Sequence, residues 1–140
     1  MASSLDAGLL STPSSRELAT LFRSHHREHA ELFERTTADL GGRPFADPNP
    51  AVMQELQPAL DGLGDEDAAL RLTYDVETIL ADTYQATMGA FADKSFNVAA
   101  MSVGGAEARH AAALAQSLGL GAALQAFVTP DRAVPAGGGV

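Results

Sequence analysis

The segment FNVAAMSVGGAEARHAAALAQSL, residues 96–118, decides the fold class, because its apolar side chains recur every three or four residues. This spacing predicts a helix with one face turned toward a core. The stripe on that face consists of Phe96, Ala100, Val103, Glu107, His110, Leu114 and Leu118. Gly104 and Gly105 weaken the helix by about 1 kcal/mol each relative to alanine, or allow a neighbouring backbone to come close. Two members of the stripe, Glu107 and His110, do not suit an apolar core.

Residues 14–40 show the same helical period. Ser14 and Glu17 form a capping-box pattern at its start, and Gly41 marks its end. Its stripe again contains polar side chains, at His29 and at His26 or His25. This segment therefore predicts a second long helix with imidazoles on its inner face.

Two further helices are expected between these segments. After a proline-rich loop, Asn49 caps a short helix over residues 50–61. Acidic residues open a long helix over 65–91, and a tight turn at 93–95 leads into the last helix. Since no strand pattern or internal repeat occurs, the sequence predicts an all-α antiparallel bundle with three long helices and one short helix.

Length and composition limit the other possibilities. The 140 residues suit one bundle domain over 14–119, with an N-terminal remnant or arm over 1–13 and an irregular C-terminal extension over 120–140. Nine Lys and Arg against 18 Asp and Glu give a formal net charge of −9, which disfavours nucleic-acid binding. No run of ~18 apolar residues could span a membrane. The absence of Cys excludes disulfides and thiolate metal sites.

The polar residues on the apolar stripes converge at one level. Glu77 lies about 16 residues before the turn near Asp93 and Glu107 about 14 after it, so at ~1.5 Å per residue their carboxylates fall within one helical turn of each other. His26 and His29 lie near the middle of the first long helix. A buried carboxylate without a partner costs several kcal/mol. We therefore expect these groups either to share a cation or to form a metal-free network of ion pairs.

Two residues near these groups, His25 and Tyr84, can each be interpreted in two ways. His25 suits a flanking, solvated position better than a ligand, although it is four residues from His29. Tyr84 suits a core aromatic with a satisfied hydroxyl, and as an alternative a redox-active phenol beside a metal.

The motifs together resemble the ferritin-like superfamily, and in particular the ferritin-like domain proteins common in actinobacteria. Glu107 and His110 form a Glu-x-x-His motif, Glu77 stands seven residues before Tyr84, and His26 and His29 form His-x-x-His where many members have Glu-x-x-His. The resemblance implies a four-helix bundle around a di-iron or di-manganese centre. The residues that it implies as metal ligands are His26, His29, Glu77, Glu107 and His110. It also implies a hydrogen-bonding or catalytic role for Tyr84.

The sequence also departs from this family pattern. Full-length members begin with another long helix that supplies a Glu, and here Leu5 to Leu9 match its last turn at most. A truncated chain or a second copy would account for this, so a homodimer or a place in a larger complex is expected. His26 in place of Glu favours a single Fe, Mn or Zn ion over a pair of ions.

Two functions follow as hypotheses. The first is an oxidoreductase-like metalloprotein that oxidises iron or reacts with oxygen or peroxide. The second is a non-catalytic interaction or structural subunit with a vestigial site. The chain as given carries no secretory signal and is expected in the cytoplasm as it stands, whereas relatives of this kind are often exported to the cell envelope.

Overall fold

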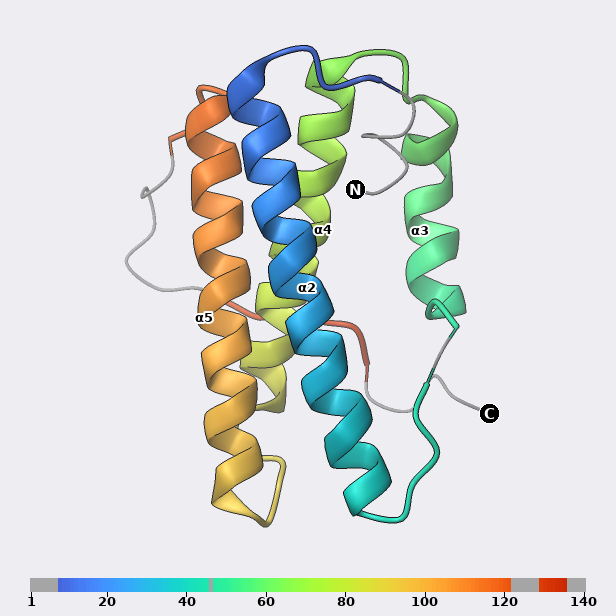
Figure 1. Ribbon diagram of the computed structural model, residues 1–140, viewed down its shortest axis with the longest axis vertical. Coiled ribbons are helices and arrows are strands. Elements are labelled where there is room, and N and C mark those ends of the chain that lie inside the picture. Colours follow the sequence, from blue (N-terminus) through green and yellow to red (C-terminus); the bar gives the residue numbers. More distant parts are fainter. Residues whose placement is uncertain (1–7, 46, 122–128, 136–140) are drawn as a thin grey trace.

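The computed structural model describes residues 8–45, 47–121 and 129–135, which form four helices and no strand within these ranges (Figure 1). The helices are α2 (Pro13–Asp39), α3 (Pro50–Asp61), α4 (Glu66–Thr87) and α5 (Lys94–Ser117). The all-α bundle with three long helices and one short helix is thus confirmed. Two of the expected regions lie partly outside the described residues. These parts are residues 1–7 of the N-terminal remnant expected over 1–13, and residues 122–128 and 136–140 of the C-terminal extension expected over 120–140.

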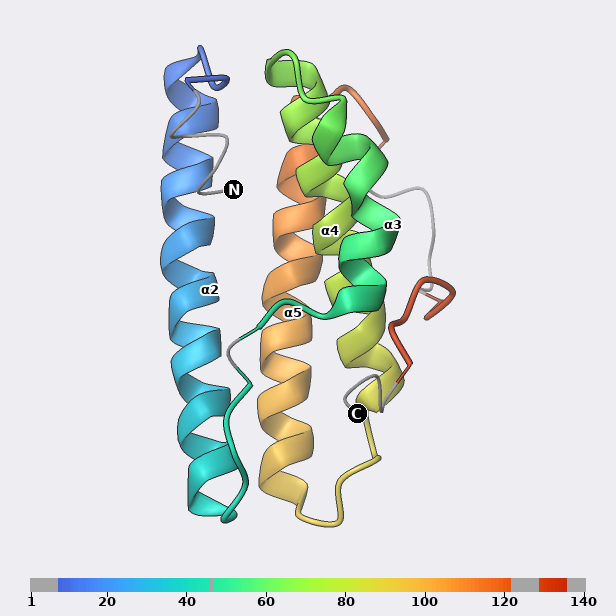
Figure 2. The same ribbon diagram turned by 90° about the vertical axis from the view of Figure 1, so that its right-hand side faces the viewer.

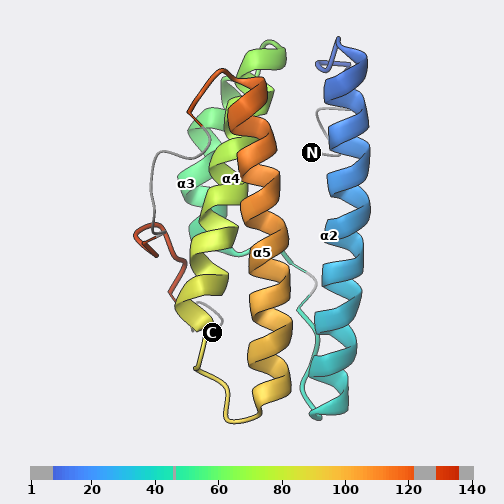
Figure 3. The ribbon, with the colours of Figure 1, turned by 90° about the vertical axis from the view of Figure 1, so that its left-hand side faces the viewer.

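The helices α4 and α5 form a closely packed antiparallel hairpin. Helix α2 lies beside this hairpin and runs opposite to α5 (Figures 1 and 3). The short α3 packs on α4 at the side away from α2 (Figure 2). This arrangement turns one face of each long helix toward a common interior.

Helix ends follow local capping rules, with three corrections to the expected boundaries. The cap of α2 is Thr12, whose side chain accepts a hydrogen bond from the Ser15 amide, so the capping box expected at Ser14 is wrong. Helix α4 ends at Thr87, before residue 91, because Gly89 adopts a φ of 82° that breaks the helical path. Helix α5 starts at Lys94 with Asp93 as its cap, so the last two residues of the turn expected over 93–95 already belong to the helix. The cap at Asn49 is confirmed.

The start of α2 is tied to the start of α4. The Glu66 carboxylate accepts hydrogen bonds from the amides of Ser11 and Thr12, at 2.8 and 3.1 Å, and from the Thr12 hydroxyl at 2.8 Å. Hydrogen bonds from Ser11, Ser15 and Thr12 lower the pKa of Glu66 to about 2. Below this tie, Leu10, Ala19 and Ala69 form a small apolar cluster.

Residues 129–135, the C-terminal strap, lie against the outer side of α4. The backbone amide of Arg132 donates to Oδ2 of the buried Asp82 at 3.1 Å, and the amide of Val134 donates to the Thr83 hydroxyl at 3.0 Å. The Arg132 guanidinium donates to Asp75 Oδ1 at 2.9 Å. The strap is irregular, but it is fixed to α4 by these polar contacts.

The interior at mid-height is polar. The largest fully buried side chains among the described residues are Phe22, Leu114, Glu77 and Glu107. In the described part of the chain, none of the helices combines the length and apolar character that a membrane crossing requires. Two carboxylates among the most deeply buried groups direct attention to the middle of the bundle.

Candidate metal centre

Four side chains from three helices meet at mid-height and are called here the Glu/His cluster. They are His26 of α2, Glu77 of α4, and Glu107 and His110 of α5. Each offers one ligand atom, and these atoms all lie within 4.8 Å of one another. The convergence expected from residue spacing alone is therefore present in the fold.

Each imidazole of the cluster faces both carboxylates. His26 Nε2 lies 3.4 Å from Glu77 Oε1 and 3.2 Å from Glu107 Oε2. His110 Nδ1 lies 3.2 Å from Glu77 Oε2 and 3.0 Å from Glu107 Oε2. The i, i+3 spacing on α5 places Glu107 and His110 on one face, as helix geometry requires.

Burying the ionisable groups of the cluster costs free energy unless partners compensate for it. Glu77 is 0% exposed, Glu107 2% and His110 4%. Glu77 Oε1 is fully buried and has no hydrogen-bond partner among the described residues; its one ion-pair neighbour is His26 Nε2, at 3.4 Å. A buried carboxylate oxygen without a donor is the kind of group that a cation satisfies.

Within the cluster, the carboxylates favour the protonated form of the imidazoles, and the imidazoles favour the ionised form of Glu107. Burial alone would lower the pKa of His26, but its hydrogen bond to Glu107 and the negative charges of Glu107 and Glu77 raise it to about 9. The same groups outweigh burial and raise the pKa of His110. Burial would raise the pKa of Glu107, but hydrogen bonds from His110 and His26 hold it below its ordinary value. In the metal-free chain, imidazolium–carboxylate pairing therefore holds the cluster together.

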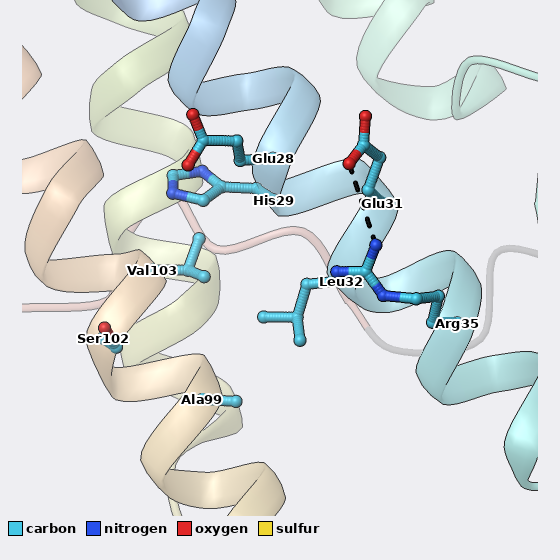
Figure 4. Close-up of a pocket in the computed structure, with 8 residues that line it drawn as sticks. All are labelled: Glu28, His29, Glu31, Leu32, Arg35, Ala99, Ser102 and Val103. Carbon is cyan, nitrogen blue, oxygen red and sulfur yellow. Dashed lines mark ion pairs between the residues drawn. The ribbon is translucent and has the colours of Figure 1, made fainter.

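The other expected ligand, His29, lies at the edge of the cluster. Its Nδ1 is 3.0 Å from Glu107 Oε1, the oxygen that faces away from His26 and His110 in these contacts. His29 is not among the four residues whose ligand atoms converge. It also lines a pocket of about 380 Å³ between α2 and α5 (Figure 4). The residues around that pocket are Glu28, His29, Glu31, Leu32, Arg35, Ala99, Ser102 and Val103.

His25 was expected in a flanking, solvated position. That expectation holds only in part, because its side chain also contacts the cluster. Its Nδ1 lies 2.9 Å from His110 Nε2. Phe22, one turn earlier on α2, stacks on the His110 ring with centroids 3.9 Å apart and an angle of 23°. His25 was expected on this stripe only as the alternative to His26, and no contact of Phe22 with the site was predicted, although the spacing of Phe22, His25, His26 and His29 at i, i+3, i+4 and i+7 places all four toward one side of α2.

Tyr84 lies on α4, two turns after Glu77. Its ring stacks on Phe33 of α2, with centroids 5.8 Å apart and an angle of 18°. Burial and the charge of Glu107 raise the pKa of Tyr84 to about 12, so the phenol stays protonated at neutral pH. The packing fits the core-aromatic interpretation, and a redox role stays a prediction.

A helical bundle with carboxylates and imidazoles from three helices at its centre is the architecture of ferritin-like proteins. The family model described as ferritin-like domain matches residues 3–120, which is most of the chain. The chain therefore belongs to this family, and the resemblance of its motifs is confirmed. Searches of curated proteins and of solved structures gave no match.

Proposed function

We propose that this chain is a ferritin-like metal-binding protein that holds one divalent ion, iron or manganese, in the Glu/His cluster. The observation that carries this proposal is the buried Glu77 Oε1, which lacks a hydrogen-bond donor among the described residues, beside three other converging ligand atoms. Within the cluster this oxygen has one ion-pair neighbour, His26 Nε2 at 3.4 Å, which is the longest of the four contacts and does not form a hydrogen bond with it.

The donor set fits such an ion. Bonds of ~2.1 Å to a tetrahedral ion separate neighbouring ligand atoms by roughly 3.4 Å. The four imidazole–carboxylate separations in the cluster lie between 3.0 and 3.4 Å. Two imidazoles and two carboxylates suit Fe(II), Mn(II) or Zn(II). We favour iron, with manganese or zinc as alternatives.

A single ion is favoured over a pair. His29 contacts only the outer oxygen of Glu107, so it orients that carboxylate or, in a di-iron version of the site, binds a second ion there. Its side chain is 19% exposed and lines the pocket between α2 and α5, so small molecules in that pocket can reach His29. This placement gives His29 an accessory role in a one-ion site.

The chemistry then divides between ion and protein. An iron ion, when bound, supplies one-electron chemistry toward oxygen or peroxide, or is itself the species oxidised. Glu77 and Glu107 would neutralise the charge of the cation, and three of the four cluster residues, Glu77, Glu107 and His110, are buried. Tyr84 carries its proton at neutral pH, because burial and the charge of Glu107 raise its pKa to about 12. Iron oxidation or reaction with a small oxidant is the activity proposed for the site.

Metal content tests the proposal directly. The full chain, stripped of metal, is titrated anaerobically with Fe(II), and bound iron per chain is measured. We expect about one ion for the wild type, and loss of binding in Glu77→Gln and His110→Ala. Glu34→Gln, an exposed carboxylate on α2, is the matched control and should bind as the wild type does. A wild type that takes up no Fe(II), Mn(II) or Zn(II) would refute the proposal.

A second function is favoured by one surface observation. Helix α5 exposes Val98 and Met101, at 60% and 53%, one turn apart on its outer side. Exposed apolar side chains at this spacing suit contact with another helix. The alternative is therefore a non-catalytic interaction module that self-associates as a dimer or joins a larger complex, with a vestigial site. Sedimentation of the wild type against Met101→Lys tests it, and a monomer at all concentrations would count against self-association.

A further inference from the structure

The ring of His110 is held on three sides. Its Nδ1 edge faces Glu77 and Glu107 at 3.2 and 3.0 Å. Phe22 covers one face, with centroids 3.9 Å apart. His25 Nδ1 lies 2.9 Å from Nε2 at the opposite edge. His110 is 4% exposed, so its orientation is set by protein neighbours, which also include the His26 ring with centroids 5.5 Å apart.

The contact between His25 and His110 is a hydrogen bond in the plane of the rings. The planes differ by 11°, while the centroids are 5.1 Å apart and the two nitrogens only 2.9 Å. Stacked ring faces approach to ~3.5 Å at best, so a shorter nitrogen–nitrogen distance between near-parallel rings requires an edge-to-edge contact. One nitrogen must donate and the other accept.

The direction of this bond follows from the other edge of the ring. A neutral imidazole that binds a cation through one nitrogen carries its proton on the other. Because Nδ1 is the nitrogen beside the carboxylates, the proton must sit on Nε2, which then needs an acceptor. His25 Nδ1 is at that position. His25 is partly exposed, so water can accept from its own Nε2–H.

We propose that His25 is a positioning residue, which accepts a hydrogen bond from His110 Nε2–H and thereby fixes Nδ1 of His110 as the metal-binding nitrogen. This inference rests on the proposed metal site and deepens it. Two adjacent residues of α2 thus serve the site: His26 is a ligand, and His25 orients a second ligand, His110 of α5. Partners that orient ligand histidines typically change metal affinity by about 10–100-fold.

Zinc is the probe for the test, because Zn(II) is diamagnetic and binds four oxygen and nitrogen ligands of this kind in a tetrahedral site. Binding to the metal-free full chain is measured by chelator competition for the wild type, His25→Leu, His25→Gln and Ser24→Ala. Leucine removes the acceptor, whereas the glutamine amide oxygen can replace it. Ser24→Ala changes a neighbouring, partly exposed position on the same helix. We expect Zn(II) affinity to fall roughly 10–100-fold in His25→Leu, with substantial recovery in His25→Gln and no change in Ser24→Ala.

A second readout separates orientation from general destabilisation. Long-range proton–nitrogen NMR of the zinc-loaded wild type should show His110 bound through Nδ1 and protonated at Nε2. In His25→Leu this assignment should be lost or mixed while the helical circular dichroism is retained. Equal affinity and an unchanged His110 tautomer in all four proteins would overturn the role of His25 and leave the metal site intact. A wild type that binds no Zn(II) and no other divalent ion would overturn both.

Discussion

A Cβ atom added to Gly104 of α5 would lie 2.8 Å from the Cβ atom of Tyr84 on α4. The glycine therefore lets the two helices approach more closely than any side chain would allow. Gly104 stands three residues before Glu107, and Tyr84 seven after Glu77. This close contact adjoins the Glu/His cluster and helps to set the distance between its carboxylates.

The paired glycines give a test of this contact. Gly104→Ala should lower the free energy of unfolding by about 1–3 kcal/mol, because the new methyl group meets a rigid Cβ atom. Gly105→Ala should raise it by about 0.5–1 kcal/mol, since no atom lies within 4 Å of the added Cβ and alanine favours the helix. Urea denaturation of the two variants measures both effects. Equal stabilities would show that the close approach is not required.

Glu107→Gln removes the negative charge of the cluster's central carboxylate while it keeps the side-chain shape. Three imidazoles contact this carboxylate: His26 at 3.2 Å, His29 at 3.0 Å and His110 at 3.0 Å. We expect the pKa of His26 to fall from about 9 toward its ordinary value, and the metal-free chain to lose about 1–3 kcal/mol of stability. Histidine NMR titration and urea denaturation measure the two changes. An unaltered His26 pKa would contradict the pairing, and Glu34→Gln provides the control.

The stability of the metal-free chain should depend on pH on both sides of a maximum. The pKa of His26, about 9, is raised above its ordinary 6.5, so its stabilising contribution is complete below pH 6.5 and is lost as pH rises through 9. The pKa of Glu107 is lowered from 4.5, so its contribution is present above pH 4.5 and is lost as pH falls further. We expect the melting temperature to be highest between about pH 5 and 6.5. A melting temperature that rises from pH 6.5 to 9 would contradict this.

Stabilisation by bound metal should increase as pH rises above 6, whereas the stability of the metal-free chain should decrease. Protons compete with the cation at His26 and His110, whose pKa values are raised, so binding releases protons. The gain in melting temperature on adding excess Zn(II) should therefore increase between pH 6 and 8. Thermal scans of wild type and Glu77→Gln, with and without Zn(II), measure it. A zinc effect that is equal in both proteins would place binding outside the cluster.

The sequence was sufficient for the helices and for the residues that meet at their centre. Glycine and proline marked the helix ends, and Glu107, His110, Glu77 and His26 were visible because they interrupt apolar stripes. The level at which they meet followed from the rise per residue and the short turn between α4 and α5. These are local features, which is why pattern alone predicted them.

Other features depend on contacts between distant segments. Two adjacent histidines on α2 both border its inner face, and the rotation of that helix against α5 decides that His25 contacts His110. Glu66 is the helix-start charge expected for α4, but its carboxylate also accepts a hydrogen bond from the amide of Thr12, the cap of α2, 54 residues earlier. Asp82 is buried, and its partner is the Arg132 amide in the C-terminal strap, 50 residues later. No periodicity within one helix contains such information.

The contact between Asp82 and the C-terminal strap should decide how firmly residues 129–135 hold to α4. Asp82 is 5% exposed, and its Oδ2 accepts from the Arg132 amide at 3.1 Å. Asp82→Ala leaves this amide without its partner and should cost about 1–3 kcal/mol. Because the strap then detaches more often, trypsin should cleave after Arg132 several-fold faster. Asp67→Asn, which alters an exposed carboxylate on the same helix, should leave the cleavage rate unchanged. Equal rates in the wild type and in both variants would mean that the strap is held by other contacts.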